Sequence, residues 1–142
     1  MISVEVENRS GVEVDDAGAV ELAGRVLRAE GIGEGELGIA FVGLDEMREL
    51  KRDHLGVDEA TDVLSFPIDG RDELPAGLPR ALGDVVLCPQ VVGEEWRWPL
   101  THGLLHLLGY DHHEDADRGR MTRAEARLGR KGGLRRGLIA RS

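Results

Sequence analysis

Cysteine is almost absent from this sequence, because Cys88 is the single cysteine among 142 residues. One cysteine excludes an intrachain disulfide framework and a cysteine-rich zinc module. Aromatic residues make up only 4% of the chain, so the core must be built from Val, Leu, Ile and Ala. Cys88 is expected in that core, since its spacing from the histidines fits no metal-ligand motif.

Long apolar runs are also missing. No stretch approaches the roughly 20 apolar residues of a membrane helix, and the N-terminal residues lack the basic and apolar regions of a signal peptide. Hydrophobic residues nevertheless make up 41% of the chain, which is enough for a core. We therefore expect a single domain over residues 1–142 that is cytoplasmic, has no membrane partner and is a monomer.

Charge is unevenly distributed along the chain, whose formal net charge is −9. Residues 118–142 hold nine of the 18 Lys and Arg residues and one of the 27 Asp and Glu residues, so the preceding body carries a charge of about −17. Such a basic tail is either a solvated final helix or a surface that attracts phosphate. Charge alone does not distinguish these alternatives.

The order of the predicted elements indicates an α+β fold or a mixed α/β sheet. Alternating apolar residues predict strands at 2–6 and 37–42, and two further strands are predicted at 62–68 and 82–87. Apolar residues at helical spacing predict one helix that begins at Asp15 and Asp16 and a second helix over 44–54. Glycine and proline within 69–80 predict a loop or hairpin connection, and the pattern after Trp98 is helical with an interruption near Gly109.

Four of the five histidines lie within residues 102–113. His102 and His106 are four residues apart, so on a helix both rings project from one face, opposite the leucines at 100, 104, 107 and 108. Gly109 can end that helix in a left-handed conformation, and the following turn can return His112 to the same point. Three converging nitrogens with a fourth position left open are typical of a catalytic zinc site. The alternative is a set of histidines that form hydrogen bonds in or near the core.

The spacing of the three histidines equals that of a class of zinc metalloproteases, H-E-x-x-H-x-x-G-x-x-H. Position 103 is glycine here, whereas those proteases have the glutamate that acts as general base. The missing glutamate argues against ordinary peptide hydrolysis.

Three segments together resemble the YbeY family of bacterial endoribonucleases. The run HGLLHLLGYDH at 102–112 is similar to the family's histidine signature. Residues 60–67, ATDVLSFP, resemble its TDVLSFP strand, and residues 82–87, LGDVVL, resemble its LGDI segment. The three motifs occur in the family's order over the span 60–113.

The resemblance implies both a fold and a function. It implies a mixed, mostly antiparallel four-stranded sheet packed with helices, and a zinc-binding helix like that of the zincins, with zinc held by His102, His106 and His112. It also implies a single-strand-specific endoribonuclease that matures the 3′ end of small-subunit ribosomal RNA and acts in ribosome quality control. Its partner would be the small ribosomal subunit.

Two departures from the family pattern concern the substrate cleft. Many members carry a Tyr-Arg pair before the TDVLSFP strand, and the matching positions here are His54 and Leu55. Arg52, Arg135 and Arg136 are candidates to supply the missing cation. The segment from 88 to 101 is also shorter than is usual in the family, which leaves open how one wall of the cleft is closed.

Several polar residues outside the histidine triplet are weaker candidates for a role in the site. Asp111 either orients a ligand imidazole, acts as a base in catalysis, or stabilises the tight turn. His113 is expected to be exposed. Asp62 and Ser65 either face a groove beside the metal or are structural, and Asp84 needs a partner if it is buried.

Two other functions remain open. A metalloprotease-like zinc hydrolase is supported by the histidine spacing and opposed by Gly103. A ribosome-assembly factor without catalytic activity would hold a structural zinc through a fourth ligand such as Asp111 or His113.

Overall fold

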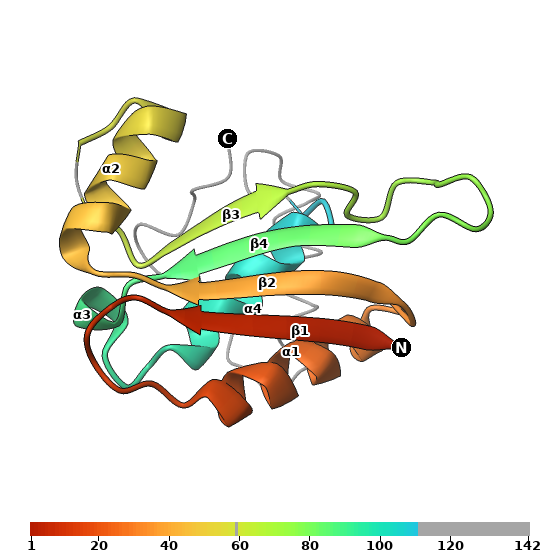
Figure 1. Ribbon diagram of the computed structural model, residues 1–142, viewed down its shortest axis with the longest axis horizontal. Coiled ribbons are helices and arrows are strands. Elements are labelled where there is room, and N and C mark those ends of the chain that lie inside the picture. Colours follow the sequence, from red (N-terminus) through yellow and green to blue (C-terminus); the bar gives the residue numbers. More distant parts are fainter. Residues whose placement is uncertain (59, 111–142) are drawn as a thin grey trace.

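The computed structural model describes residues 1–58 and 60–110. Within these residues a four-stranded sheet combines with four helices (Figure 1). The order is β1 (Ile2–Asn8), α1 (Asp16–Ala29), β2 (Gly35–Phe41), α2 (Leu44–Leu55), β3 (Val63–Pro67), β4 (Ala81–Leu87), α3 (Pro89–Val92) and α4 (Arg97–Leu107). The predicted strands and the first two helices are therefore confirmed, with small differences at their ends. None of the described helices is long and apolar enough to cross a membrane.

The sheet is mostly parallel, so the expectation of a mostly antiparallel sheet is wrong. Its strand order is β1-β2-β4-β3; β1 pairs with β2 and β2 pairs with β4 in parallel, whereas only β3 and β4 are antiparallel. The segments that connect consecutive strands determine these strand directions. Helix α1 carries the chain back before β2, as a parallel pair requires. The connection predicted within 69–80 as a loop or hairpin joins the antiparallel strands β3 and β4 and returns β4 between β3 and β2.

Helix α1 begins as the sequence predicts. The Asp15 side chain accepts a hydrogen bond of 2.9 Å from the Gly18 amide at the N-terminus of the helix. The buried face of α1 carries Ala19, Leu22, Ala23, Val26 and Leu27. This face packs with α4 and with the inward residues of the sheet to form the main core. In Figure 1, α1 and α4 lie on the same side of the sheet.

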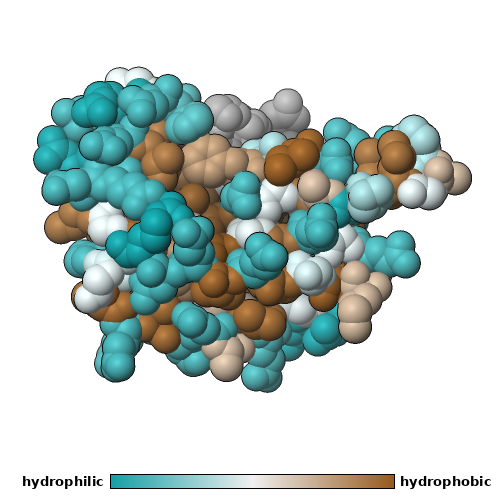
Figure 2. Space-filling model, in the orientation of Figure 1, coloured by the Kyte–Doolittle hydropathy of each residue, from teal (hydrophilic) through white to brown (hydrophobic). Residues whose placement is uncertain are grey.

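A second, smaller cluster lies on the other face of the sheet under α2. Met47 of α2 packs there with Val42, Leu64, Val86 and Cys88. Cys88 is fully buried, as predicted for a core residue. Burial raises the pKa of its thiol. The rest of this face carries hydrophilic side chains between apolar ones (Figure 2).

Candidate metal centre

Helix α4 brings His102 and His106 together as their spacing predicts. Their Nε2 atoms lie 2.9 Å apart, and the two rings meet edge to face with centroids 4.6 Å apart. Both side chains are buried, at 0% and 2% exposure. The two nitrogens therefore point to one place inside the protein.

The surroundings of α4 differ from the expected two-sided helix. Every residue from Pro99 to Leu107 is buried, including the side that carries the histidines. Leu100, Leu104, Leu107 and Leu108 lie in the main core, as predicted for the apolar face. The histidine pair consequently lies in a site shielded from bulk water, where electrostatic interactions are stronger than at a surface.

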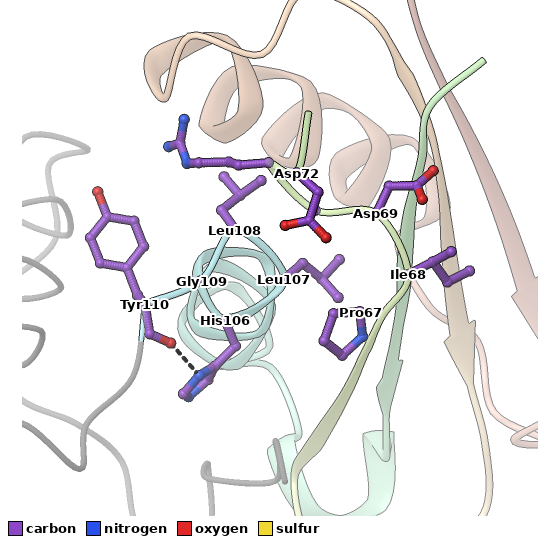
Figure 3. A pocket seen from close by; sticks show the side chains of 11 residues that line it. Pro67, Ile68, Asp69, Asp72, His106, Leu107, Leu108, Gly109 and Tyr110 are labelled. Atoms are coloured by element: carbon purple, nitrogen blue, oxygen red, sulfur yellow. Dashed lines mark hydrogen bonds between the residues drawn. The ribbon is translucent and has the colours of Figure 1, made fainter. Parts of the chain in front are cut away.

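The end of α4 fixes the orientation of the His106 ring. Gly109 has a φ of +100°, its amide donates to the His106 carbonyl at 3.0 Å, and the Tyr110 amide donates to the Leu105 carbonyl at 3.1 Å. This is the Schellman ending predicted at Gly109. It places the Tyr110 carbonyl 2.8 Å from His106 Nδ1 (Figure 3).

This contact determines which nitrogen of His106 carries the proton. A carbonyl oxygen only accepts hydrogen bonds, so Nδ1 must be the donor, which leaves the lone pair of the neutral ring on Nε2. That lone pair faces His102. A backbone carbonyl that holds the far nitrogen of a ligand imidazole is the usual support of a metal-binding histidine.

Burial also prepares His102 as a ligand. Desolvation lowers the pKa of His102 to about 3, because a charged imidazolium loses its hydration in this site. The ring is thus neutral around pH 7, which is the form that binds a metal.

The third predicted ligand, His112, lies outside the described residues, as do Asp111 and His113. Among residues 1–58 and 60–110, no group of three or more His, Cys, Asp and Glu side chains is placed to hold a metal ion. The two members of the triplet that are described, His102 and His106, fit zinc by three observations: converging Nε2 atoms, a neutral His102 and a His106 ring held through Nδ1. Tetrahedral zinc with nitrogens at 2.0–2.1 Å requires ligand atoms about 3.3 Å apart, which is a small adjustment from 2.9 Å.

Gly103 faces the sheet and not the metal centre. A Cβ atom at this position would lie 2.8 Å from Val85 Cγ1, 3.1 Å from Ser65 Oγ and 3.1 Å from Val63 Cγ2. A glutamate at this position, as in a metalloprotease, would therefore require these neighbouring side chains to move.

Asp62 and Ser65, the polar residues of the strand motif, form hydrogen bonds with the backbone. The Asp62 carboxylate accepts a 2.9 Å hydrogen bond from the Val63 amide, and the Ser65 hydroxyl donates to the Gly103 carbonyl at 2.9 Å. Asp84 is exposed on the opposite face of the sheet. There it lines a groove of about 660 Å³ together with His54 and Phe66. It is therefore not the buried strand aspartate that would need a partner.

The positions of the family's Tyr-Arg pair lie at the end of α2. Leu55 packs against the smaller cluster, and His54 meets Phe66 edge to face at 4.9 Å. Arg52 is half exposed, with its Nε 3.5 Å from Asp53 Oδ1. The other candidate cations, Arg135 and Arg136, lie outside the described residues.

The shortened segment from 88 to 101 forms α3 and the first turns of α4. The Arg97 guanidinium lies 4.4 Å from the centre of the Trp96 ring in this segment.

A cavity of about 240 Å³ adjoins His106 at the end of α4 (Figure 3). His106 and Tyr110 line it from the helix side, and Asp69, Arg71 and Asp72 line it from the loop after β3. Arg71 forms a 2.7 Å ion pair with Glu30, whose side chain is only 2% exposed. Sequence reasoning missed Glu30, Arg71 and Tyr110, because no local pattern marks contacts that span 41 and 80 positions.

Comparison with known proteins identifies the family of this chain. The family Endoribonuclease YbeY matches residues 5–132. Curated relatives named Endoribonuclease YbeY include one from Beutenbergia cavernae, 41% identical over 89% of this chain and 95% of its own length. Another, from Salinispora tropica, is 35% identical over 89% of this chain and 94% of its own length. The solution structure of TM1509 from Thermotoga maritima is 26% identical, with a TM-score of 0.54, and the match covers 90% of this chain and 86% of that one. The chain belongs to the YbeY endoribonuclease family.

Proposed function

We propose that this protein is a zinc-dependent endoribonuclease specific for single-stranded RNA, which matures the 3′ end of small-subunit ribosomal RNA and acts in ribosome quality control. Family membership supports RNA hydrolysis as the reaction. The observation that carries the metal dependence is the 2.9 Å convergence of the two Nε2 atoms in a buried site. The proposal requires a cytoplasmic protein, and we expect it to bind the small ribosomal subunit as a monomer.

Zinc would be held by His102, His106 and His112. A bound zinc supplies Lewis-acid stabilisation of the charge that develops at a phosphodiester. The protein's own contribution is to keep His102 neutral through burial and to hold the His106 ring through the Tyr110 carbonyl. Asp111 is the candidate for a residue that orients a ligand or takes up a proton.

Attraction of the RNA backbone would fall to arginines, because the body of the chain is strongly acidic. Arg135 and Arg136 belong to the basic tail, and Arg52 is exposed on α2. Phosphate contacts of this kind are electrostatic, so RNA binding should weaken as salt rises.

Three measurements on one preparation test the proposal. The zinc-loaded protein is incubated with a single-stranded RNA that spans the 3′ end of small-subunit ribosomal RNA, with the same sequence as a duplex, and with casein. We expect cleavage of the single strand only, and its loss when a chelator removes the metal. Casein cleavage would favour a protease, and zinc binding without RNA cleavage would favour an assembly factor. Either result would contradict the proposal.

A further inference from the structure

Glu30 is a buried acid that none of the chemistry proposed above uses. It follows the last residue of α1, and its side chain is 2% exposed. A carboxylate is placed in such a position only when its oxygens are paired, because burying an isolated charge is costly. The partners of Glu30 therefore indicate why an acid lies there.

One partner is Arg71, from the loop between β3 and β4. Its guanidinium donates to the Glu30 carbonyl at 2.9 Å and to the Glu30 carboxylate at 2.7 Å. The loop that carries Arg71 is itself held by Arg80, which donates to the Gly70 carbonyl at 2.6 Å and to the Asp72 carbonyl at 2.8 Å. The charge of Glu30 is thus compensated by a cation from a fixed loop.

A second partner is Tyr110, which lies shortly after α4. Its hydroxyl donates a 2.8 Å hydrogen bond to the same carboxylate oxygen, Glu30 Oε1. At its other end, the Tyr110 carbonyl accepts from His106 Nδ1 at 2.8 Å. One residue therefore connects the buried acid to the imidazole whose Nε2 faces His102.

The two helices end in the same way beside this connection. In α1 the Gly31 amide donates to the Arg28 carbonyl and the Ile32 amide to the Leu27 carbonyl, which repeats the Schellman geometry of Gly109 and Tyr110 in α4. Both ends are closed by backbone hydrogen bonds, and the Glu30–Tyr110 hydrogen bond joins one helix end to the other. The orientation of His106 depends on that connection.

We propose that Glu30 is a positioning residue of the metal centre: through the Tyr110 hydroxyl it fixes the Tyr110 carbonyl, and through that carbonyl it holds the His106 ring with Nε2 toward the metal. Arg71 compensates the charge of the Glu30 carboxylate through their 2.7 Å ion pair. The inference rests on the metal centre of the proposed function. It adds to that centre a support that comes from the other end of the sequence.

The test uses the full-length protein and Co²⁺ as a spectroscopic substitute for zinc. Tyr110→Phe removes the hydroxyl and keeps both the ring and the carbonyl that contacts His106. Supporting residues of this kind typically contribute 10- to 100-fold to metal affinity, so we expect Co²⁺ to bind at least about tenfold more weakly with an altered visible spectrum. Glu30→Ala should weaken binding by a similar factor, and the double variant should be no weaker than either single variant, because both changes break one contact.

Two variants provide the matched controls. Glu30→Gln keeps an oxygen that can accept from the Tyr110 hydroxyl, so it should bind Co²⁺ more tightly than Glu30→Ala. Glu46→Gln breaks the 2.6 Å ion pair between Glu46 of α2 and Arg9, which does not involve His102 or His106, and should leave Co²⁺ affinity unchanged.

A second measurement reports the tautomer of His106 directly. In the metal-free protein, the ¹⁵N shifts of the His106 ring should show a proton on Nδ1 in the wild type and a mixture of tautomers in Tyr110→Phe.

The outcomes distinguish an error in the metal centre from an error in the role of Glu30. If the wild type binds no Co²⁺, the metal centre of the proposed function is wrong and this inference falls with it. If the wild type binds Co²⁺, but Tyr110→Phe retains its affinity, its visible spectrum and the Nδ1 tautomer, the metal centre stands and the role of Glu30 is overturned. Tyr110→Phe gives this answer even if Glu30→Ala does not fold.

Discussion

The Ser65 hydroxyl donates a 2.9 Å hydrogen bond to the Gly103 carbonyl, which joins β3 to the residue directly after the first histidine of α4. The contact is possible because Gly103 has no side chain between the helix and the sheet. Val63 and Val85 occupy the space that a Cβ atom would need. Glycine at position 103 therefore allows the helix to pack against the sheet, and it also leaves the site without the glutamate of a metalloprotease.

We predict that Gly103→Glu creates no protease and destabilises the fold. Its Cβ would overlap Val85 Cγ1 at 2.8 Å, and overpacking typically costs about 1–3 kcal/mol before the cost of a buried charge is added. Thermal unfolding should show a melting temperature several degrees lower, and casein should remain uncleaved. Gly33→Glu is the matched control, because a Cβ there meets nothing within 4 Å. Casein cleavage by Gly103→Glu would show that the substrate class is mistaken.

The histidine pair predicts a zinc content of one ion per chain. A double variant, His102→Ala with His106→Ala, should lose the zinc, since only one of the three proposed ligands would remain. Zinc at 100 times its dissociation constant stabilises the folded state by about 2.7 kcal/mol, and this increment should disappear in the variant. His54→Ala removes a histidine of α2 and serves as the control. If metal analysis finds as much zinc in the double variant as in the wild type, His102 and His106 do not bind it.

The stability of the metal-free protein should depend on pH through His102. Burial lowers its pKa to about 3, whereas the unfolded chain has the ordinary value near 6.5. Below pH 6.5 the unfolded state therefore binds a proton that the folded state excludes. The free energy of unfolding is unaffected by this group above about pH 6.5, and it falls by up to about 1.4 kcal/mol per pH unit as the pH drops toward 3.

This dependence is measured by denaturant unfolding at several pH values with chelator present. His102→Gln should lack the His102 contribution, while the carboxylates that titrate in the same range remain in both proteins. The difference between the two curves isolates the imidazole. Parallel curves between pH 6.5 and 4 would show that His102 is not held neutral by burial.

Local patterns predicted much of this molecule. Apolar patterns identified the strand segments, with alternation in the strand at 2–6. Asp15 marked the start of α1, and the spacing of His102 and His106 predicted that their nitrogens meet. These features depend on residues a few positions apart. Gly109 belongs with them, because a left-handed glycine after an apolar helix ends it in a known geometry.

The remaining features required the tertiary structure. Alternation tells which side of a strand is buried but not which way the strand runs, so the mostly parallel sheet was not predicted. The burial of the histidine face of α4 also escaped a helical wheel, which describes one helix without its neighbours. Glu30 reaches Tyr110 across 80 positions, and no periodicity within either segment indicates that contact.

The last prediction concerns the basic tail and its contribution to RNA binding. Truncation of residues 131–142, which lie outside the described part of the chain, removes Lys131, Arg135, Arg136 and Arg141. If these four cations contact phosphates, the slope of log K against log salt should shrink by up to about 3, at about 0.7 for each contact with a single strand. Zinc content should not change, because the proposed ligands lie upstream. Filter binding of single-stranded RNA at several salt concentrations measures the slope.

A second variant, Arg52→Gln, separates the tail from the exposed arginine of α2. One lost phosphate contact reduces the slope by about 0.7 to 0.9, so a change of this size in Arg52→Gln would assign one contact to α2 independently of the tail. The alternative for the tail is an electrostatic contact with the acidic body, whose charge is about −17. Truncation would then lower the melting temperature and leave the slope unchanged. An unchanged slope in a folded, zinc-loaded truncation would therefore exclude the tail from RNA binding and leave Arg52 as the candidate cation.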